Sequence, residues 1–175
     1  MGRLRTLHPE TGVVSGVQGY GRDYRSYPDG DYKVLNNAET LFPQDEHDRR
    51  RPPKEHVLGI PRDHGFGMAF PCSLLHGLGD KAVVHDDVQG TRAIVVFWPA
   101  AAETAIAFVP CVNGQDLTFD ARDYGFFGIE NGSEWTLRGR AISGPLEGSM
   151  LELVSDTFIS FWFAWSTFHP NTALC

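Results

Sequence analysis

The fold of this chain is decided by the run Arg92-Ala93-Ile94-Val95-Val96-Phe97-Trp98. The run is rich in β-branched and aromatic residues and almost continuously apolar, which is typical of a strand buried on both faces. Two runs of the same kind flank it, at residues 81–88 and 104–109. Together the three runs predict central strands that the rest of the chain covers on both sides.

Shorter runs around this centre have the pattern of further strands. Glycine occurs 19 times and proline 11 times, which favours many turns and short strands over long helices. One short helical turn is expected at residues 73–78. We therefore predict a mainly β fold, a β-sandwich or a partly closed antiparallel barrel, with one or two short helices. The further strands are expected at residues 55–60, 67–70, 117–119, 125–128, 135–142 and 150–154.

The segment 158–168 has a helical pattern. Its apolar residues fall at i, i+3, i+4 and i+7, and Asp156 stands where it could cap the helix. Other aromatic residues lie off this stripe, so the segment is apolar nearly all round. Core packing and contact with a partner both fit that pattern. For the second case we predict a partner interface made by Phe158, Phe161, Trp162, Phe163 and Trp165.

Residues 1–53 are predicted to form an extended arm, which Pro52-Pro53 ends, and residues 54–175 a single β-rich domain. The arm has neither a helical nor a strand period, but it is rich in tyrosine. Tyrosine combines apolar area with a polar tip, so the arm can lie along a protein surface. It either wraps its own domain or reaches another subunit. In the second case its interface residues are Tyr20, Tyr24, Tyr27 and Tyr32.

The bulk composition argues against several classes of function. Hydrophobic residues make up 42% and charged residues 21% of the 175 residues, as in an ordinary soluble globular protein. Acidic and basic side chains balance over residues 1–56, so the net charge of −7 lies on residues 57–175. A nucleic-acid-binding protein needs a basic face, and none is visible. The run Arg49-Arg50-Arg51 follows acidic residues and is predicted to be a solvated turn.

The sequence also predicts neither a membrane span nor a signal peptide. Its most hydrophobic stretch is too short to cross a bilayer, and no apolar core follows the N-terminal residues. Cys72, Cys111 and Cys175 cannot all pair, and none belongs to a CxxC motif. A disulfide framework and a structural zinc site are therefore not expected. We predict no cofactor.

The best candidate for metal chemistry is the segment His85-Asp86-Asp87. An imidazole and carboxylates can bind a divalent metal. On a strand His85 and Asp87 would share a face, with His64 or His76 completing the set. The competing interpretation is that this is a strand end whose aspartates support the following turn.

Two weaker candidates involve a thiol and a pair of carboxylates. Cys72 stands at a possible helix start, where the helix dipole could lower its pKa, and His76 is four residues on. The other interpretation of Cys72 is a small buried hydrophobic residue. Glu130 and Glu134 could do acid–base work but are expected to be solvated in a turn.

Four runs make the chain resemble domain-of-unknown-function family 3179 (DUF3179). They are 19–24 (GYGRDY), 52–59 (PPKEHVLG), 139–146 (GRAISGPL) and 161–165 (FWFAW), in this order along nearly the whole chain. The family is mostly bacterial or archaeal, its members are commonly exported, and they often contain the unit twice. The chain resembles the C-terminal unit of a two-unit member, introduced by the end of a preceding unit, because 7–13 (LHPETGV) echoes 168–174 (FHPNTAL).

The chain departs from the family pattern where many members carry reactive residues. A cysteine-containing segment after the central strand is replaced here by residues 97–104, and a His-Glu pair by residues 81–87. The resemblance therefore implies that any chemistry at those places is lost. We predict a non-catalytic structural or binding subunit, part of a larger assembly with a protein partner. The alternatives are a metal-dependent enzyme or metal-binding protein using His85, Asp87 and a second histidine, and a domain that binds a small ligand in a barrel mouth.

Overall fold

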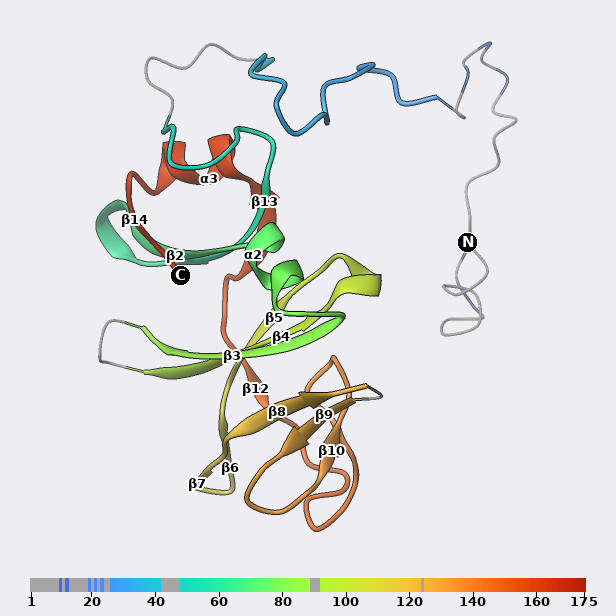
Figure 1. Cartoon of the computed structure of the whole chain (residues 1–175), viewed down its shortest axis with the longest axis vertical. Helices are drawn as coiled ribbons and strands as arrows, with labels where there is room; N and C mark the ends of the chain where they lie inside the picture. Colours follow the sequence, from blue (N-terminus) through green and yellow to red (C-terminus); the bar gives the residue numbers. More distant parts are fainter. Residues whose placement is uncertain are drawn as a thin grey trace. The chain divides into compact units, whose positions relative to one another are not determined.

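The structure is a computed structural model that describes residues 10, 12, 19, 21, 23, 26–41, 48–88, 92–123 and 125–175. The chain divides into two compact units, Met1–Tyr32 and Lys33–Cys175. The strands and helices in the described part belong to the second unit (Figure 1). The predicted arm over residues 1–53 lies partly outside the described residues and stays a prediction.

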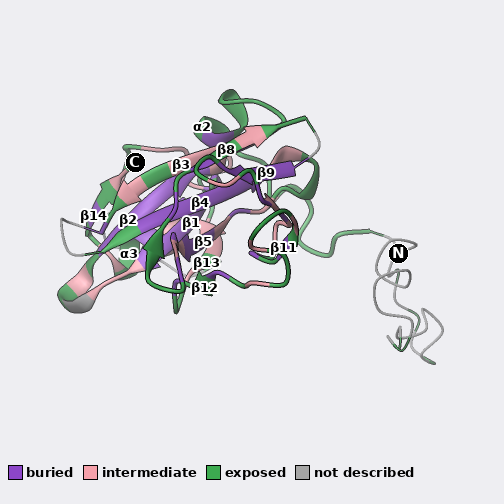
Figure 2. Ribbon diagram, turned by 90° about the horizontal axis from the view of Figure 1, so that it is seen from below, coloured by how far each residue is buried: buried purple, intermediate pink, exposed green. Residues whose placement is uncertain are grey.

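The central sheet has the order β12-β5-β4-β3 and is antiparallel throughout. β4 is buried along almost its whole length (Figure 2), because its alternate side chains enter two different cores. The prediction of a strand buried on both faces is therefore confirmed for β4. β3 lies at the sheet edge and is only half-buried. The strands are β3 (Lys81–Asp87), β4 (Ala93–Pro99), β5 (Ile106–Val109) and β12 (Glu152–Leu153).

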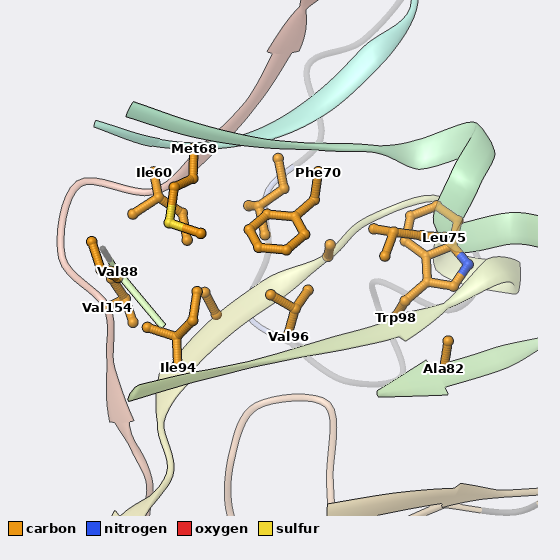
Figure 3. Close-up of a cluster of buried hydrophobic side chains, with 13 residues drawn as sticks. Ile60, Met68, Phe70, Leu75, Ala82, Val88, Ile94, Val96, Trp98 and Val154 are labelled. Carbon is orange, nitrogen blue, oxygen red and sulfur yellow. The ribbon is translucent and has the colours of Figure 1, made fainter. Parts of the chain in front are cut away.

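One face of the central sheet packs against a second sheet of order β13-β1-β2-β14, which we call the helix-covered sheet. Figure 3 shows Ile60, Met68 and Phe70 of this sheet facing Ile94 and Val96 of β4. The short α2 (Cys72–Gly77) follows β2 directly and adds a buried leucine to the same core. The strands are β1 (His56–Pro61), β2 (Phe66–Pro71), β13 (Phe158–Phe161) and β14 (Asn171–Leu174), and the 3-10 turn η1 (Asp63–Gly65) joins β1 to β2.

The other face of the central sheet packs against the outer sheet, of order β11-β10-β9-β8. The Phe97 ring of β4 stacks on the Phe126 ring of β9, with centroids 4.3 Å apart. The outer sheet contains β8 (Phe119–Arg122), β9 (Gly125–Gly128), β10 (Glu134–Trp135) and β11 (Ala141–Ser143). A small hairpin of β6 (Cys111–Val112) and β7 (Gln115–Asp116) turns at Asn113-Gly114, both with positive φ, and η2 (Ala100–Ala102) follows β4.

The helix α3 (Trp162–Phe168) covers the remaining face of the helix-covered sheet. The ring of Trp165 lies over Gly59 and Gly67, where a Cβ would overlap it. Its indole N–H donates to Thr172 Oγ1 of β14 at 2.9 Å, and the His169 ring stacks on it at 4.0 Å between centroids. The second copy of the His-Pro echo therefore joins α3 to β14, while the first copy lies largely outside the described residues.

The acidic and basic residues before β1 form part of this packing. Trp162 Nε1 donates to the Asp48 carbonyl at 2.9 Å. Arg50 pairs with the Asp48 carboxylate at 2.7 Å and donates to the Thr172 carbonyl at 2.9 Å. The predicted solvated turn is therefore half right: Arg50 stays largely exposed, but this segment also binds α3 and β14.

The fold class is confirmed, since the described residues are mainly β, with stacked, mostly antiparallel sheets and two short α-helices; β14 pairs in parallel with β2. Within the described ranges no sheet closes into a barrel. Three local predictions are wrong. Residues 158–168 form a strand and then a helix, with Asp156 in a left-handed turn (φ 60°) instead of at a cap. Residues 135–142, expected as one strand, form two strands joined by a turn, and the strand expected at 117–119 is replaced by β7 at 115–116 and β8 at 119–122.

Candidate functional site

A pocket of about 350 Å³ lies where β1 begins, α2 follows β2 and β4 ends; we call it the α2 pocket. The strand order explains its position, because β1 and β4 belong to the two sheets that enclose the first core. It brings together two side chains that the sequence marked as a candidate pair, Cys72 and His76. The other titratable or polar side chains that line it include Lys54, Glu55, His56 and Ser73.

Glu55 is a buried carboxylate held by two partners. Arg51 donates from Nε to Glu55 Oε2 and from Nη2 to Oε1, each at 2.6 Å. The Ser73 hydroxyl donates to the same carboxylate. Burial raises the pKa of Glu55, but the hydrogen bonds from Arg51 and Ser73 outweigh it and hold the pKa below its ordinary value. Glu55 is therefore an ionised structural group in the pocket wall.

Cys72 is the candidate nucleophile, and its surroundings oppose that role. Burial, helped by the negative charge of Glu55, raises the pKa of the Cys72 thiol to about 11. From the sequence, the helix start was expected to lower the pKa of this thiol. In the structure the pKa is raised instead. His76 lines the same pocket but is exposed. The thiol is therefore protonated at neutral pH and behaves as a small, weakly polar group.

Lys54 and His56 of the lining lie against two aromatic rings outside it, those of Phe161 and Phe163. Lys54 is only 2% exposed, and its Nζ lies 4.3 Å from the Phe163 ring centroid and 5.7 Å from that of Phe161. The His56 ring stacks on Phe161 at 4.9 Å between centroids. Two of the aromatic residues predicted for a partner interface thus contact residues of the α2 pocket. Such contacts stabilise a cation in a poorly solvated place.

Trp98, the last large side chain of β4, also lines the pocket. It is 3% exposed, and its indole N–H has no hydrogen-bond partner among the described residues. Figure 3 shows the indole beside Leu75, with its nitrogen directed away from the other core side chains. Buried indole N–H groups usually have an acceptor, so this donor marks a place where one is missing.

Sequence reasoning missed Trp98, Lys54 and Glu55 as site residues. Trp98 was assigned to the core, which is correct for its ring but not for its N–H. Lys54 and Glu55 could have been found from their position, because they stand directly before a buried strand, where both charges would need partners. The sequence could not show that Arg51 and Ser73 would be those partners of Glu55.

The predicted metal ligands are only partly brought together. His85 and Asp87 lie on one face of β3, and His85 Nε2 lies 3.0 Å from the Phe119 amide nitrogen. His64 stands in η1, at the turn of the helix-covered sheet. Over the described ranges, no three His, Cys, Asp or Glu side chains are grouped to hold a metal ion. The metal site stays a prediction, which elemental analysis of the purified chain would test.

The carboxylates Glu130 and Glu134 lie in different surroundings, since Glu130 is exposed in a turn and Glu134 is half-buried in β10. Glu130 accepts the backbone N–H of Thr118 at 2.8 Å. Burial raises its pKa, but the hydrogen bonds from Thr118 outweigh this and leave it below the ordinary value. Glu130 therefore supports the turn before β8.

The predicted interface residues have different degrees of exposure. Trp162 and Trp165 of α3 are buried against the helix-covered sheet, whereas Phe158 is 50% exposed. Phe161 and Phe163 are half-buried. Of the tyrosines, Tyr27 is 40% exposed and Tyr32 half-buried, while Tyr20 and Tyr24 lie outside the described residues. The interface itself stays a prediction.

Comparison with known proteins identifies the family. In the described part of the chain, no helix is long and apolar enough to cross a membrane. No curated protein and no solved structure matches the sequence significantly. The model of one family, described as a protein of unknown function (DUF3179), matches residues 1–172. Because the match covers nearly the whole sequence, the chain belongs to the DUF3179 family.

Proposed function

We propose that this chain is a non-catalytic binding protein whose ligand site is the α2 pocket, and that it works within a larger assembly. The pocket is of the size that small-molecule sites have in proteins, and polar groups converge on it. The observation that carries the proposal is the state of Cys72, the candidate nucleophile that stands four residues before His76.

The groups best suited to chemistry in this pocket are held in unreactive states. A thiol with a pKa of about 11 supplies very little thiolate at neutral pH, and the thiolate is the nucleophile. The Ser73 hydroxyl points at Glu55, but a carboxylate with a lowered pKa is a weak base. These environments suit recognition better than catalysis.

Exposed aromatic side chains support the assembly part of the proposal. Phe158 at the start of β13 is 50% exposed, and Phe168 at the end of α3 is 77% exposed. Aromatic residues are enriched at the cores of protein interfaces. We expect the chain to elute from a source extract in a complex larger than its own mass. Elution as a monomer at native concentration would contradict this part.

The reactivity of Cys72 tests the non-catalytic part. In a variant with Cys111→Ser and Cys175→Ser, Cys72 is the one remaining thiol. The rate of its alkylation by iodoacetamide, followed by mass spectrometry against pH, should rise with a midpoint above about 10, as the raised pKa requires. A midpoint below about 8 would show an activated thiolate, and the pocket would then be a candidate catalytic site.

A further inference from the structure

We propose that two copies of this chain pair through the outer edge of β13, so that the helix-covered sheet continues from one copy into the other. This inference rests on the assembly part of the proposed function, because it names the partner as a second copy and the surface as β13. Three features carry it: backbone groups that face outward, an edge without the protection that neighbouring edges have, and exposed apolar side chains beside it.

The backbone groups of β13 that face away from β1 are the first feature. β13 stands at one end of the strand order of the helix-covered sheet (Figure 1) and pairs antiparallel with β1. The Trp162 N–H donates to the Glu55 carbonyl at 2.7 Å, and hydrogen-bonded pairs recur at every second residue from there. Ser160 therefore bonds to Val57 of β1, and the N–H and C=O of Ile159 point outward from the edge.

The second feature is that the other edges of the helix-covered and central sheets are protected. At β14, the Thr172 carbonyl accepts Arg50 Nη1 at 2.9 Å, and the Thr172 N–H donates to the His169 carbonyl at 3.0 Å. β12 has two residues, one of them charged, and β3 has charged residues at three of its seven positions. Covered backbone groups, short strands and charges keep an edge from pairing with another chain. The four residues of β13 carry no charge, and no strand in the described part of the chain pairs with its outer side.

Exposed apolar side chains beside this edge are the third feature. Phe158 is 50% exposed, and Leu153 of β12 is 59% exposed. Both line a groove of about 380 Å³, together with Ile159 and Ile106. Solvent therefore reaches the surroundings of the edge, and a second copy seated there would remove apolar surface from water.

A second copy fits this edge because the pairing is self-complementary about Ile159. In a two-fold antiparallel pair centred there, the N–H and C=O of Ile159 bond to Ile159 of the other copy. Phe158 of one copy then lies opposite Ser160 of the other, so that a large side chain meets a small one. In the same register the two Asp156 residues lie at opposite ends of the paired strands, and their like charges do not meet.

Sedimentation velocity of the purified full chain, between about 3 and about 300 µM, tests whether copies pair. We expect a monomer–dimer equilibrium with a dissociation constant between about 10 and 100 µM, because a short edge gives a small interface. Sedimentation as a monomer at about 300 µM would overturn the inference.

Amide hydrogen exchange of the wild-type chain locates the interface. The Ile159 N–H should exchange at least about twofold more slowly at about 300 µM than at about 30 µM, because the fraction of dimer rises. The Ser160 N–H faces β1 in both states, so its exchange rate should change much less. A dimer without this difference between the two amides would overturn the role of β13.

A pair of variants tests the same edge through its side chains. Phe158→Lys places a charge on the edge and should raise the dissociation constant at least about tenfold. Phe168→Lys is the matched control, since this phenylalanine is 77% exposed at the end of α3, just before β14, and it should leave the constant unchanged. Equal effects of the two variants would overturn the inference. The Phe158 ring contacts Trp165, so if Phe158→Lys folds poorly the exchange of the wild-type amides decides.

The results also separate this inference from the proposed function. A pure chain that is monomeric, but elutes from a source extract in a larger complex, overturns the second copy and leaves the assembly in place. A pure chain that pairs through β13, but elutes from the extract as a monomer, supports the inference and contradicts the assembly at native concentration. Binding at the α2 pocket is independent of both results.

Discussion

Arg51→Met would test the ion pair between Arg51 and Glu55, a carboxylate in the wall of the α2 pocket. The Glu55 side chain is 4% exposed and that of Arg51 22%, and two hydrogen bonds of 2.6 Å join them. Removing one partner of a buried ion pair costs about 3–5 kcal/mol, because the other charge is left uncompensated. Water can reach Arg51, and Ser73 still donates to Glu55, so we expect a loss of about 3 kcal/mol at pH 7.

The loss should depend on pH, and its sign follows from the pKa of Glu55. In the wild-type protein this pKa is lowered, so the pair's contribution is present above pH 4.5 and is lost as the pH falls through the folded-state pKa. In the variant, burial without the arginine raises the pKa of Glu55, and the folded state tolerates the protonated acid. The difference in free energy of unfolding between the two proteins should therefore shrink as the pH falls toward about 3.5.

Urea denaturation followed by tryptophan fluorescence measures this difference at both pH values. Arg92→Met is the matched control, since it breaks an ion pair of the same length whose side chains are 41% and 70% exposed. It should cost less than about 1 kcal/mol at either pH. A loss for Arg51→Met below about 1 kcal/mol at pH 7, or one that does not change with pH, would refute the account of this pair.

Two further predictions concern the packing of α3, and urea denaturation checks both. Gly59→Ala would place a Cβ inside the Trp165 ring and should cost at least about 2 kcal/mol, whereas Gly77→Ala, with open space around it, should be nearly neutral; equal effects would contradict the packing. Thr172→Val leaves the Trp165 indole N–H without its acceptor and should cost about 1–3 kcal/mol, while Thr172→Ser should keep most of the stability.

Much of the sheet structure could be predicted from the sequence, because the local pattern and the burial agree there. β4 is apolar at every position from Ile94 to Trp98, and it packs against a sheet on each side. The prediction failed where a strand and a helix share one apolar run. Phe158 contacts the Trp165 ring while Ile159 packs into the core of the other face, so β13 shows no alternation of apolar and polar residues.

β14 was missed for a different reason. It is short, contains Asn171 and Thr172, and pairs in parallel with β2, far away in the sequence. The sequence around β14 has neither a hairpin turn nor a strand-like composition from which the strand could be predicted. Its position depends on tertiary contacts such as the hydrogen bond from Trp165 to Thr172.

The candidate site was predictable only in part. The spacing of Cys72 and His76 pointed to the α2 pocket, which both residues line, but suggested the wrong direction for the pKa of the thiol. The pKa of Cys72 is raised by burial and by the charge of Glu55. Both depend on how β1 and α2 pack together, which the sequence does not show. Whether the N–H of Trp98 has a hydrogen-bond partner likewise depends on the residues around the end of β4. No sequence pattern predicts those tertiary contacts.

The position of a bound small aromatic probe, benzoate, is the most direct test of the central claim, that the α2 pocket is a site for binding. Intermolecular NOEs should be measured between benzoate ring protons and the methyl groups of the full, ¹³C-labelled chain. The account predicts NOEs to Leu35 and Ala100, which line the α2 pocket with Trp98. NOEs instead to Leu153 and Ile159, which line a separate groove between β12 and β13, would contradict it.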